Sequence, residues 1–367
     1  MKIGLVTIYH VPNYGSVLQT YATQMILEKM GHECVVIRYN YRNDYFFAKQ
    51  GQKRDKFKEW QLDNIPFLKS GKLNKFRKEH LNFSKKFDTY EELEQYDWTS
   101  FDCFIVGSDQ VWNTKYLHGN PAFLLKFVPD NKPRISFSSS FATNGLPEEF
   151  RDLFTNELKK FKVLSVRESN GVDIIQRSLG INKDVQITLD PTLLLSKEDW
   201  LKNITRSPIR KKRPYILLYM WTYAFEPRPY ILRVVEHFQK IMSADVRVLE
   251  GHRELKDLQC SYIDENKACV GRFIELFANA DLVITSSFHG TAFAVNFGIP
   301  LISIVPNGES DDRQSSLLTR LALRNCIVHI GDDVSTINPK YDLESAQRRL
   351  SAIRNSDINW LFRILQV

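Results

Sequence analysis

The sequence of 367 residues lacks the features that mark secreted, zinc-binding and membrane proteins. Its five cysteines are odd in number and widely spaced, and no two of them form a C-x-x-C pair. This pattern predicts buried free thiols in a reducing compartment and argues against a disulfide framework or a structural zinc site. The apolar stretch at Lys2–Ile8 is too short for a signal peptide. We therefore expect a cytoplasmic protein.

One uncharged segment, residues 282–308, is long enough to raise the question of a membrane span, which needs about 20 apolar residues. It contains no Asp, Glu, Lys or Arg, but Gly290, Gly298, Pro300 and Pro306 interrupt it. Such breaks predict a buried strand, a turn, a short helix and a second buried strand in place of one spanning helix.

The net charge of +7 is not spread along the chain. Residues 49–86 contain twelve Lys or Arg against four Asp or Glu, so this segment carries +8 and the remainder −1. A nucleic-acid-binding protein would be basic more uniformly, and we expect no nucleic-acid partner. The segment is interpreted either as a solvated insertion or as a surface that meets anionic lipid headgroups at the inner face of a membrane, through Lys53, Arg54, Lys56 and Lys58.

The composition, with 43% hydrophobic and 25% charged residues, is ordinary for a globular protein and excludes a disordered chain, a collagen or a coiled coil. Strand-like and helix-like segments alternate from the start, with a strand over 2–8, a helix over 16–30 and a strand over 33–39. This order predicts an α/β fold class with two doubly wound, Rossmann-like domains and a cleft between them.

The length also favours two domains, because hydrophobic cores stop growing near about 250–300 residues. We expect an N-terminal domain over 1–200 with a basic insertion at about 43–99, and a C-terminal domain over 201–341. A long amphipathic helix over 342–367 could cross back onto the first domain. The polar stretch 196–214 is the expected linker.

Familiar catalytic signatures are absent from the sequence. There is no G-x-G-x-x-G, no Walker lysine, no G-x-S-x-G, no H-E-x-x-H and no cluster of His and carboxylates at metal-ligand spacing. We therefore expect neither a metal nor a dinucleotide cofactor. Ligands of doubly wound sheets bind beyond the carboxyl ends of strands. Four polar segments follow predicted strands, at 13–16, 107–110, 138–140 and 286–290.

The strongest candidate is His289, between a predicted strand over 281–285 and a predicted helix over 291–297. The N-terminus of a helix attracts anions, and a histidine there can hold a phosphate or transfer a proton. Ser287 and Gly290 would permit the close approach of an anion. The alternative is that His289 is a buried, hydrogen-bonded core residue.

Three charged residues have two interpretations each. Asp109 either caps a helix or binds and deprotonates a sugar hydroxyl. Arg167, which leaves a predicted buried strand, either meets an anion or forms a structural ion pair with Glu168 or Asp190. Arg313 is either a further anion ligand or a solvated surface residue.

The motifs taken together resemble the polysaccharide pyruvyl transferase family. The matching pieces, in order, are Lys2–Gly4 leading to Asn13-Tyr14-Gly15-Ser16-Val17-Leu18-Gln19, then Phe104–Asn113 with Gly107-Ser108-Asp109-Gln110, Ser165-Val166-Arg167-Glu168, Leu189-Asp190-Pro191-Thr192, and Ala280–Phe293 with Ser286-Ser287-Phe288-His289-Gly290-Thr291. Each piece alone is common, whereas all five in this order are specific.

The resemblance implies a fold similar to GT-B glycosyltransferases and a role in polysaccharide biosynthesis, as in exopolysaccharide or capsule. It implies transfer of a pyruvyl group from phosphoenolpyruvate to two hydroxyls of a sugar, as a ketal, with no cofactor besides the donor. The acceptor would be a saccharide, free or lipid-diphosphate-linked. The expected site comprises the catalytic residues His289 and Asp109, the donor ligands Arg167, His289, Ser287, Gly290 and Arg313, and the acceptor ligands Asn13, Tyr14, Gly15, Ser16, Gln110 and Ser140.

Two positions depart from the family pattern. Ala142 stands where the family usually has glycine, and Val270-Gly271-Arg272 stands where proline and acidic residues are common. Neither removes an expected catalytic residue. Two other functions stay open: a GT-B glycosyltransferase with a nucleotide-sugar donor, and a non-catalytic sugar-binding or scaffold protein. Stabilisation against heat by phosphoenolpyruvate would favour a pyruvyl transferase, and stabilisation by a nucleotide sugar would favour a glycosyltransferase.

Overall fold

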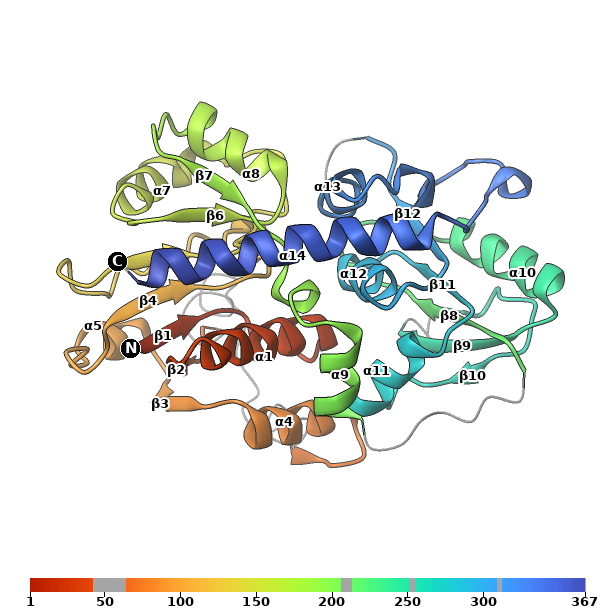
Figure 1. The fold of residues 1–367 in the computed structure, drawn as a ribbon, viewed down its shortest axis with the longest axis horizontal. Helices are drawn as coiled ribbons and strands as arrows, with labels where there is room; N and C mark the ends of the chain where they lie inside the picture. Colours follow the sequence, from red (N-terminus) through yellow and green to blue (C-terminus); the bar gives the residue numbers. More distant parts are fainter. Residues whose placement is uncertain (42–63, 206–212, 251–254, 309–311, 367) are drawn as a thin grey trace. The chain divides into compact units, whose positions relative to one another are not determined.

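The computed structural model describes residues 1–41, 64–205, 213–250, 255–308 and 312–366 (Figure 1). The chain divides into two compact units. Unit 1 consists of Met1–Ile65, Leu73–Leu194 and Asp357–Val367, and unit 2 consists of Pro66–Lys72 and Leu195–Ser356.

Unit 1 is built on a five-stranded parallel sheet in the order β3-β2-β1-β4-β5. Its strands are β1 (Lys2–Val6), β2 (Glu33–Tyr39), β3 (Phe83–Phe87), β4 (Cys103–Val106) and β5 (Arg134–Ser136). The chain adds β2 and β3 on one side of β1, and then returns to add β4 and β5 on the other. The switch point of the sheet therefore lies between β1 and β4.

Strand β3 lies inside the stretch expected to be an insertion, yet it pairs with β2 as an edge strand of the sheet. Phe87 of β3 is buried in the main core, while Lys85 and Lys86 are exposed, as suits an edge strand. The basic residues expected to meet a membrane, Lys53 to Lys58, lie outside the described residues.

Serine and threonine hydroxyls extend the unit 1 sheet. Strands β6 (Leu164–Val166) and β7 (Val185–Ile187) pair with each other, and isolated bridges join Val163 to Ile135 and Val166 to Ser139 beside β5. The amide of Ser165 donates to Ser136 Oγ at 2.7 Å, and the amide of Ser138 donates to Ser165 Oγ at 2.9 Å. Buried hydroxyls thus take the place of ladder hydrogen bonds where the sheet is interrupted.

The helices of unit 1 connect these strands. They are α1 (Tyr14–Lys29), α4 (Lys69–His80), which begins in unit 2, α5 (Tyr90–Glu94), α6 (Thr114–Leu117), α7 (Arg151–Leu158) and α8 (Ser169–Asp173), with short 3-10 or π turns η2 (Pro121–Leu124), η3 (Glu148–Phe150), η4 (Ile174–Ser178) and η5 (Pro191–Leu193). Helix α1 is buried along most of its length, and its threonines bond back to the helix, Thr20 to the Ser16 carbonyl and Thr23 to the Gln19 carbonyl, both at 2.8 Å.

Unit 2 has a six-stranded parallel sheet in the order β10-β9-β8-β11-β12-β13. The strands are β8 (Tyr215–Tyr219), β9 (Asp245–Glu250), β10 (Ile263–Asp264), β11 (Leu282–Thr285), β12 (Leu301–Val305) and β13 (Ile327–His329). The switch point of this sheet lies between β8 and β11. The expected fold class of two doubly wound parallel-sheet domains is confirmed.

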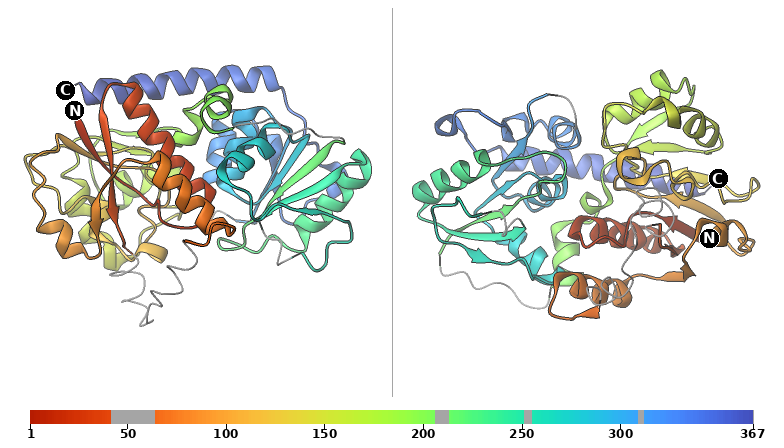
Figure 2. Two further views of the ribbon diagram at one scale, coloured as in Figure 1. Left: turned by 90° about the horizontal axis from the view of Figure 1, so that it is seen from below. Right: turned by 180° about the vertical axis from the view of Figure 1, so that it is seen from behind.

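Helices cover both faces of the unit 2 sheet (Figure 2). Residues of α10 pack on one face, and aromatic residues of α11 and α12 pack on the other, where Phe273 and Phe277 contact Tyr219. The helices are α9 (Lys197–Ile204), α10 (Tyr230–Met242), α11 (Val270–Ala278), α12 (Phe288–Phe297), α13 (Arg313–Arg320) and α14 (Leu343–Leu365), which ends in unit 1, with turns η7 (Arg324–Cys326) and η8 (Val334–Thr336).

The uncharged segment 282–308 forms β11, α12 and β12, as predicted. In the part of the chain that the structure describes, no helix combines the length and the apolar character needed to cross a bilayer.

The stretch expected to be a linker contains helix α9 of unit 2. Ser196 and Asp199 form a reciprocal capping box at its start, and Trp200 is buried with its ring 5.4 Å from that of Phe293. A capping box together with a buried tryptophan stabilises a helix and explains why this polar stretch is folded.

Candidate functional site

The loops after β1 and β4 meet at the switch point of unit 1. The hydroxyl of Ser16, in the first turn of α1, donates to Asp109 Oδ2 at 2.5 Å. Asn13 caps α1 by accepting from the amide of Gly15 at 2.8 Å, while Tyr14 and Gly15 are buried in the first turn. The structure therefore brings together the two loops that the sequence predicted to bind the acceptor.

Asp109 has an unusual backbone and is 5% exposed. Its φ of 77° lies in the left-handed region, which costs an L-residue other than glycine about 1–2 kcal/mol. Its Oδ1 accepts from the amide of Gln110 at 2.8 Å. The following helix is capped by Asn113, so Asp109 is not a helix cap. Strain of this kind gathers at functional sites, because the surroundings must impose it.

Sequence reasoning missed the supporting role of Gln19, which is buried in α1. Its Nε2 donates to Thr7 Oγ1 at 2.9 Å and to the Ser16 carbonyl at 3.0 Å. The hydroxyl of Thr7 in turn donates to the Ser108 carbonyl at 2.8 Å. Gln19 therefore ties the loop after β1 to the loop after β4. A glutamine on the buried side of a helix was the signal that could have revealed it.

Arg167 forms the structural ion pair that was one of its two interpretations from sequence. Its side chain is 2% exposed, with Nη1 2.8 Å from Asp190 Oδ2 and Nε 3.5 Å from Glu168 Oε2. Ser108 Oγ also donates to Asp190 Oδ2, at 2.7 Å. The guanidinium thus joins the ends of β6 and β7 to the β4 loop. A role in binding the donor stays a prediction.

Ser140 is fully buried and donates its hydroxyl to Glu168 Oε1. The amide of Ala142 donates to the same oxygen at 3.3 Å. In this structure Ser140 therefore supports the carboxylate of Glu168, and its expected contact with an acceptor stays a prediction. We refer to Asp109, Glu168, Asp190 and Arg167 as the unit 1 carboxylate cluster. Three of its four side chains are acidic.

His289 lies at the switch point of unit 2, in the first turn of α12, and is 7% exposed. The helix begins at Phe288, three residues before the predicted start. Ser287 is its N-cap and accepts from the amide of Gly290 at 3.4 Å. The earlier start follows from this cap, since serine is among the preferred N-cap residues. The helix N-terminus favours an anion next to His289.

Gly290 has a packing role that differs from the one expected. A Cβ at this position would overlap Thr285 Oγ1 and lie 2.9 Å from Tyr219 Cδ1. Glycine thus allows the first turn of α12 to rest directly on the carboxyl ends of β8 and β11. Close helix-to-strand contact accounts for the glycine in this structure, and its expected role in admitting an anion stays a prediction.

Arg313 and Gln314 begin α13 beside α12. Arg313 is 6% exposed, so it is not a solvated surface residue. Gln314 Nε2 donates to Ser303 Oγ at 2.7 Å and to Thr291 Oγ1 at 3.4 Å, which links the start of α13 to β12 and to the first turns of α12. Gln314 was missed by sequence reasoning. Unit 2 therefore places Arg313 and His289 on neighbouring helix N-termini.

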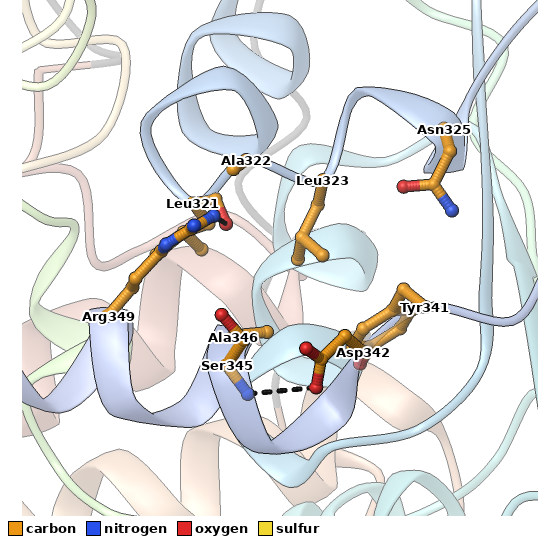
Figure 3. A pocket seen from close by; sticks show the side chains of 9 residues that line it. All are labelled: Leu321, Ala322, Leu323, Asn325, Tyr341, Asp342, Ser345, Ala346 and Arg349. Atoms are coloured by element: carbon orange, nitrogen blue, oxygen red, sulfur yellow. Dashed lines mark hydrogen bonds between the residues drawn. The ribbon is translucent and has the colours of Figure 1, made fainter.

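A pocket of about 310 Å³ in unit 2 is lined by neither His289 nor Arg313 (Figure 3). Leu323 and Asn325 of its wall directly precede β13, so it lies at the amino end of the strand, whereas ligands bind at carboxyl ends. Arg349 Nη1 donates to the Leu321 carbonyl at 3.3 Å, and the amide of Ser345 donates to Asp342 Oδ1 at 3.0 Å. The first bond ties α14 to the C-terminal end of α13, and the second caps the start of α14, so the pocket is not part of the candidate site.

Among the residues that the structure describes, no three His, Cys, Asp or Glu side chains form a group that could hold a metal ion. The expectation of a reaction without a cofactor stays a prediction.

Comparison with known proteins identifies the family of this chain. The family model for polysaccharide pyruvyl transferase matches residues 13–308, which include every motif from Asn13 to His289. No curated protein matches the sequence.

Solved structures show the likeness in fold. A UDP-GlcNAc 2-epimerase from Neisseria meningitidis bound to UDP-GlcNAc has a TM-score of 0.55 at 14% identity, over 100% of both chains. A putative UDP-N-acetylglucosamine 2-epimerase from Listeria monocytogenes has a TM-score of 0.54 at 12% identity, over 96% of this chain and 90% of that one. A glycosyltransferase from Rickettsia africae has a TM-score of 0.51 at 12% identity, over 98% and 93%. At such identities the likeness concerns the fold alone.

Proposed function

Because this chain belongs to the polysaccharide pyruvyl transferase family, we propose that it transfers a pyruvyl group from phosphoenolpyruvate to two hydroxyls of a saccharide. In this reaction C2 of the enolpyruvyl group forms two C–O bonds, and its bond to the phosphate oxygen breaks. One hydroxyl proton ends on the methylene carbon, which becomes a methyl group, and the other ends on the released phosphate. The product is a pyruvate ketal.

The observation that carries the proposal is the different charge at the two switch points. In unit 2, His289 and Arg313 lie in the first turns of the neighbouring helices α12 and α13. Their side chains and the dipoles of these two helices favour the anionic donor. In unit 1, three carboxylates against one guanidinium disfavour an anion, and Asp109 can accept hydrogen bonds from the hydroxyls of a neutral saccharide. We assign the donor to unit 2 and the acceptor to unit 1.

Two residues are assigned proton chemistry. Asp109 already accepts a hydrogen bond from the Ser16 hydroxyl, and we propose that it accepts one from an acceptor hydroxyl as that oxygen attacks. His289 can donate a proton to the donor as imidazolium and accept one as neutral imidazole. Arg167 is assigned no proton chemistry, because its guanidinium is paired with Asp190 and Glu168.

The experiment is an assay of phosphate release from phosphoenolpyruvate with saccharides that end in galactose, mannose or N-acetylhexosamine. The products are examined by proton NMR for the methyl singlet of a ketal. We expect phosphate release only with some acceptors, and one ketal per phosphate. Stabilisation against heat by a nucleotide sugar, with no phosphate release from phosphoenolpyruvate, would support a GT-B glycosyltransferase instead.

A further inference from the structure

A second pocket, of about 300 Å³, opens in unit 1 beside the Asp109 loop. Its walls come from α6, which follows β4, and from the segment 143–150, which follows β5. Both segments leave the carboxyl ends of their strands, the edge at which doubly wound sheets bind ligands. This pocket, unlike the one between α13 and α14, therefore lies on the same edge as the candidate site.

A chain of hydrogen bonds connects the pocket to Asp109. The carboxylate of Asp109 accepts from the amide of Gln110 at 2.8 Å, and Gln110 Oε1 accepts from Asn113 Nδ2 at 2.8 Å. Asn113 Oδ1 then accepts from the amide of Lys115 at 3.0 Å, at the start of α6. Lys115 lines the pocket. The pocket wall and the proposed acceptor base are thus parts of one hydrogen-bonded loop.

A glycine allows the pocket wall that contains Phe150 to lie close to the end of α6. Gly119 has a φ of 65°, and a Cβ there would lie 2.7 Å from Phe150 Cδ1. The ring of Phe150 can therefore approach the end of α6 and close one side of the pocket. His118, in the left-handed conformation with a φ of 49°, ends α6 at this point. Its Nε2 is buried and has no hydrogen-bond partner within the described residues.

The side chains around the pocket suit a ring that carries many hydroxyls. Lys115 offers donors, Glu149 offers acceptors, Thr114 and Thr143 are small and polar, and Phe150 offers an apolar ring. The charges of Lys115 and Glu149 cancel, so these two side chains do not favour a phosphate over a neutral sugar. The volume is near the lower end of the range for small-molecule pockets, about 300–1,000 Å³, which leaves room for one sugar residue.

We propose that this pocket binds one sugar residue of the saccharide acceptor, with Lys115 and Glu149 bonded to its hydroxyls. The inference rests on the proposed function, because that function supplies the saccharide. It adds the place in unit 1 where the acceptor is selected. The pocket side chains set the affinity for the acceptor and leave the chemistry to other residues.

The test uses Lys115→Ala and Glu149→Ala, which change exposed side chains, with Glu148→Ala as the matched control. Glu148 is the adjacent exposed carboxylate and does not line the pocket. Loss of a hydrogen bond to a charged group weakens binding about tenfold or more. We expect KM for the acceptor to rise about tenfold in both pocket variants, with kcat and KM for phosphoenolpyruvate unchanged, and no change in the control.

Binding is measured separately, without phosphoenolpyruvate, by saturation-transfer NMR on the same panel of saccharides. Saccharide binding that weakens in both pocket variants supports the pocket even if no pyruvyl transfer is found, in which case the proposed function alone fails. Pyruvyl transfer with an unchanged KM for the acceptor in both variants overturns the pocket and leaves the function standing. Absence of binding by every saccharide to the parent protein also overturns the pocket.

Discussion

Replacement of Gly290 by alanine tests how the first turn of α12 is positioned. The added Cβ would overlap the hydroxyl of Thr285 and meet the ring of Tyr219 at 2.9 Å, and both neighbours are fully buried. Overpacking of this kind costs about 1–3 kcal/mol, and the value here belongs near 3 because neither neighbour can move into solvent. Alanine returns up to about 1 kcal/mol through its better helix propensity. We therefore expect a net loss of about 2 kcal/mol.

The measurement is urea unfolding of Gly290→Ala at pH 7, compared with the parent protein and with Gly145→Ala. Nothing lies within 4 Å of a Cβ at Gly145, so that variant should match the parent in stability. Displacement of the first turn by about 1 Å would also move His289, and misplacement on this scale reduces turnover about a hundredfold. If Gly290→Ala is as stable as the parent and only loses affinity for phosphoenolpyruvate, the glycine serves access of the anion, and the packing argument is refuted.

Three further substitutions have definite expected outcomes. Arg167→Met leaves two buried carboxylates without their guanidinium and should lower the free energy of unfolding by about 3–5 kcal/mol, measured with denaturant; a loss below about 1 kcal/mol would contradict the ion pair. His289→Gln should keep the fold and cut turnover by about 10²–10⁴, and turnover within a few fold of the parent would make His289 a core residue. Ala142→Gly should raise the melting temperature, because a φ of 52° costs alanine about 1–2 kcal/mol and glycine little, whereas a lower melting temperature would show that the methyl group is needed for packing.

The sequence predicted the central strands well because their side chains are buried on both faces. The strand predicted over 33–39 has those bounds in the structure, since its run of Val and Ile can only suit a covered parallel strand. Edge strand β3 was missed, because Lys85 and Lys86 face solvent and only Phe87 reaches the core. Hydrophobic pattern alone does not separate such a strand from a solvated loop.

The interior hydroxyls were harder to interpret than the apolar residues. Ser138 and Ser140 look like loop residues in sequence, but both are fully buried and bond to other strands or to Glu168. The hydroxyl of Ser138 donates to the Leu189 carbonyl, 51 positions away in the chain, and that of Ser140 donates to Glu168, 28 positions away, so no local pattern could identify these partners. The same applies to Arg167, whose partner Asp190 was only one of two that the sequence allowed.

The candidate site was predictable as segments rather than as contacts. The rule that ligands bind beyond the carboxyl ends of strands selected the loops that contain Asp109 and His289. The hydrogen bond from Ser16 to Asp109 depends on the crossover of α1, which brings residues 93 positions apart together. The role of Gly290 depends on the depth at which α12 sits on the sheet, and only the structure supplies that depth.

The division of unit 1 into separated stretches has a consequence for biosynthesis. Residues from Asp357 onward complete this unit, where Asp357 Oδ2 accepts from the amide of Leu189 at 2.7 Å and Trp360 stacks on Phe137 with ring centroids 6.3 Å apart. A ribosome releases Leu195–Ser356, and with it the whole sheet of unit 2, before Asp357 emerges. Domains usually mature in the order in which they are translated. Here the sheet of unit 1 is translated first, but unit 1 lacks the segment from Asp357 onward until the whole sheet of unit 2 has been made.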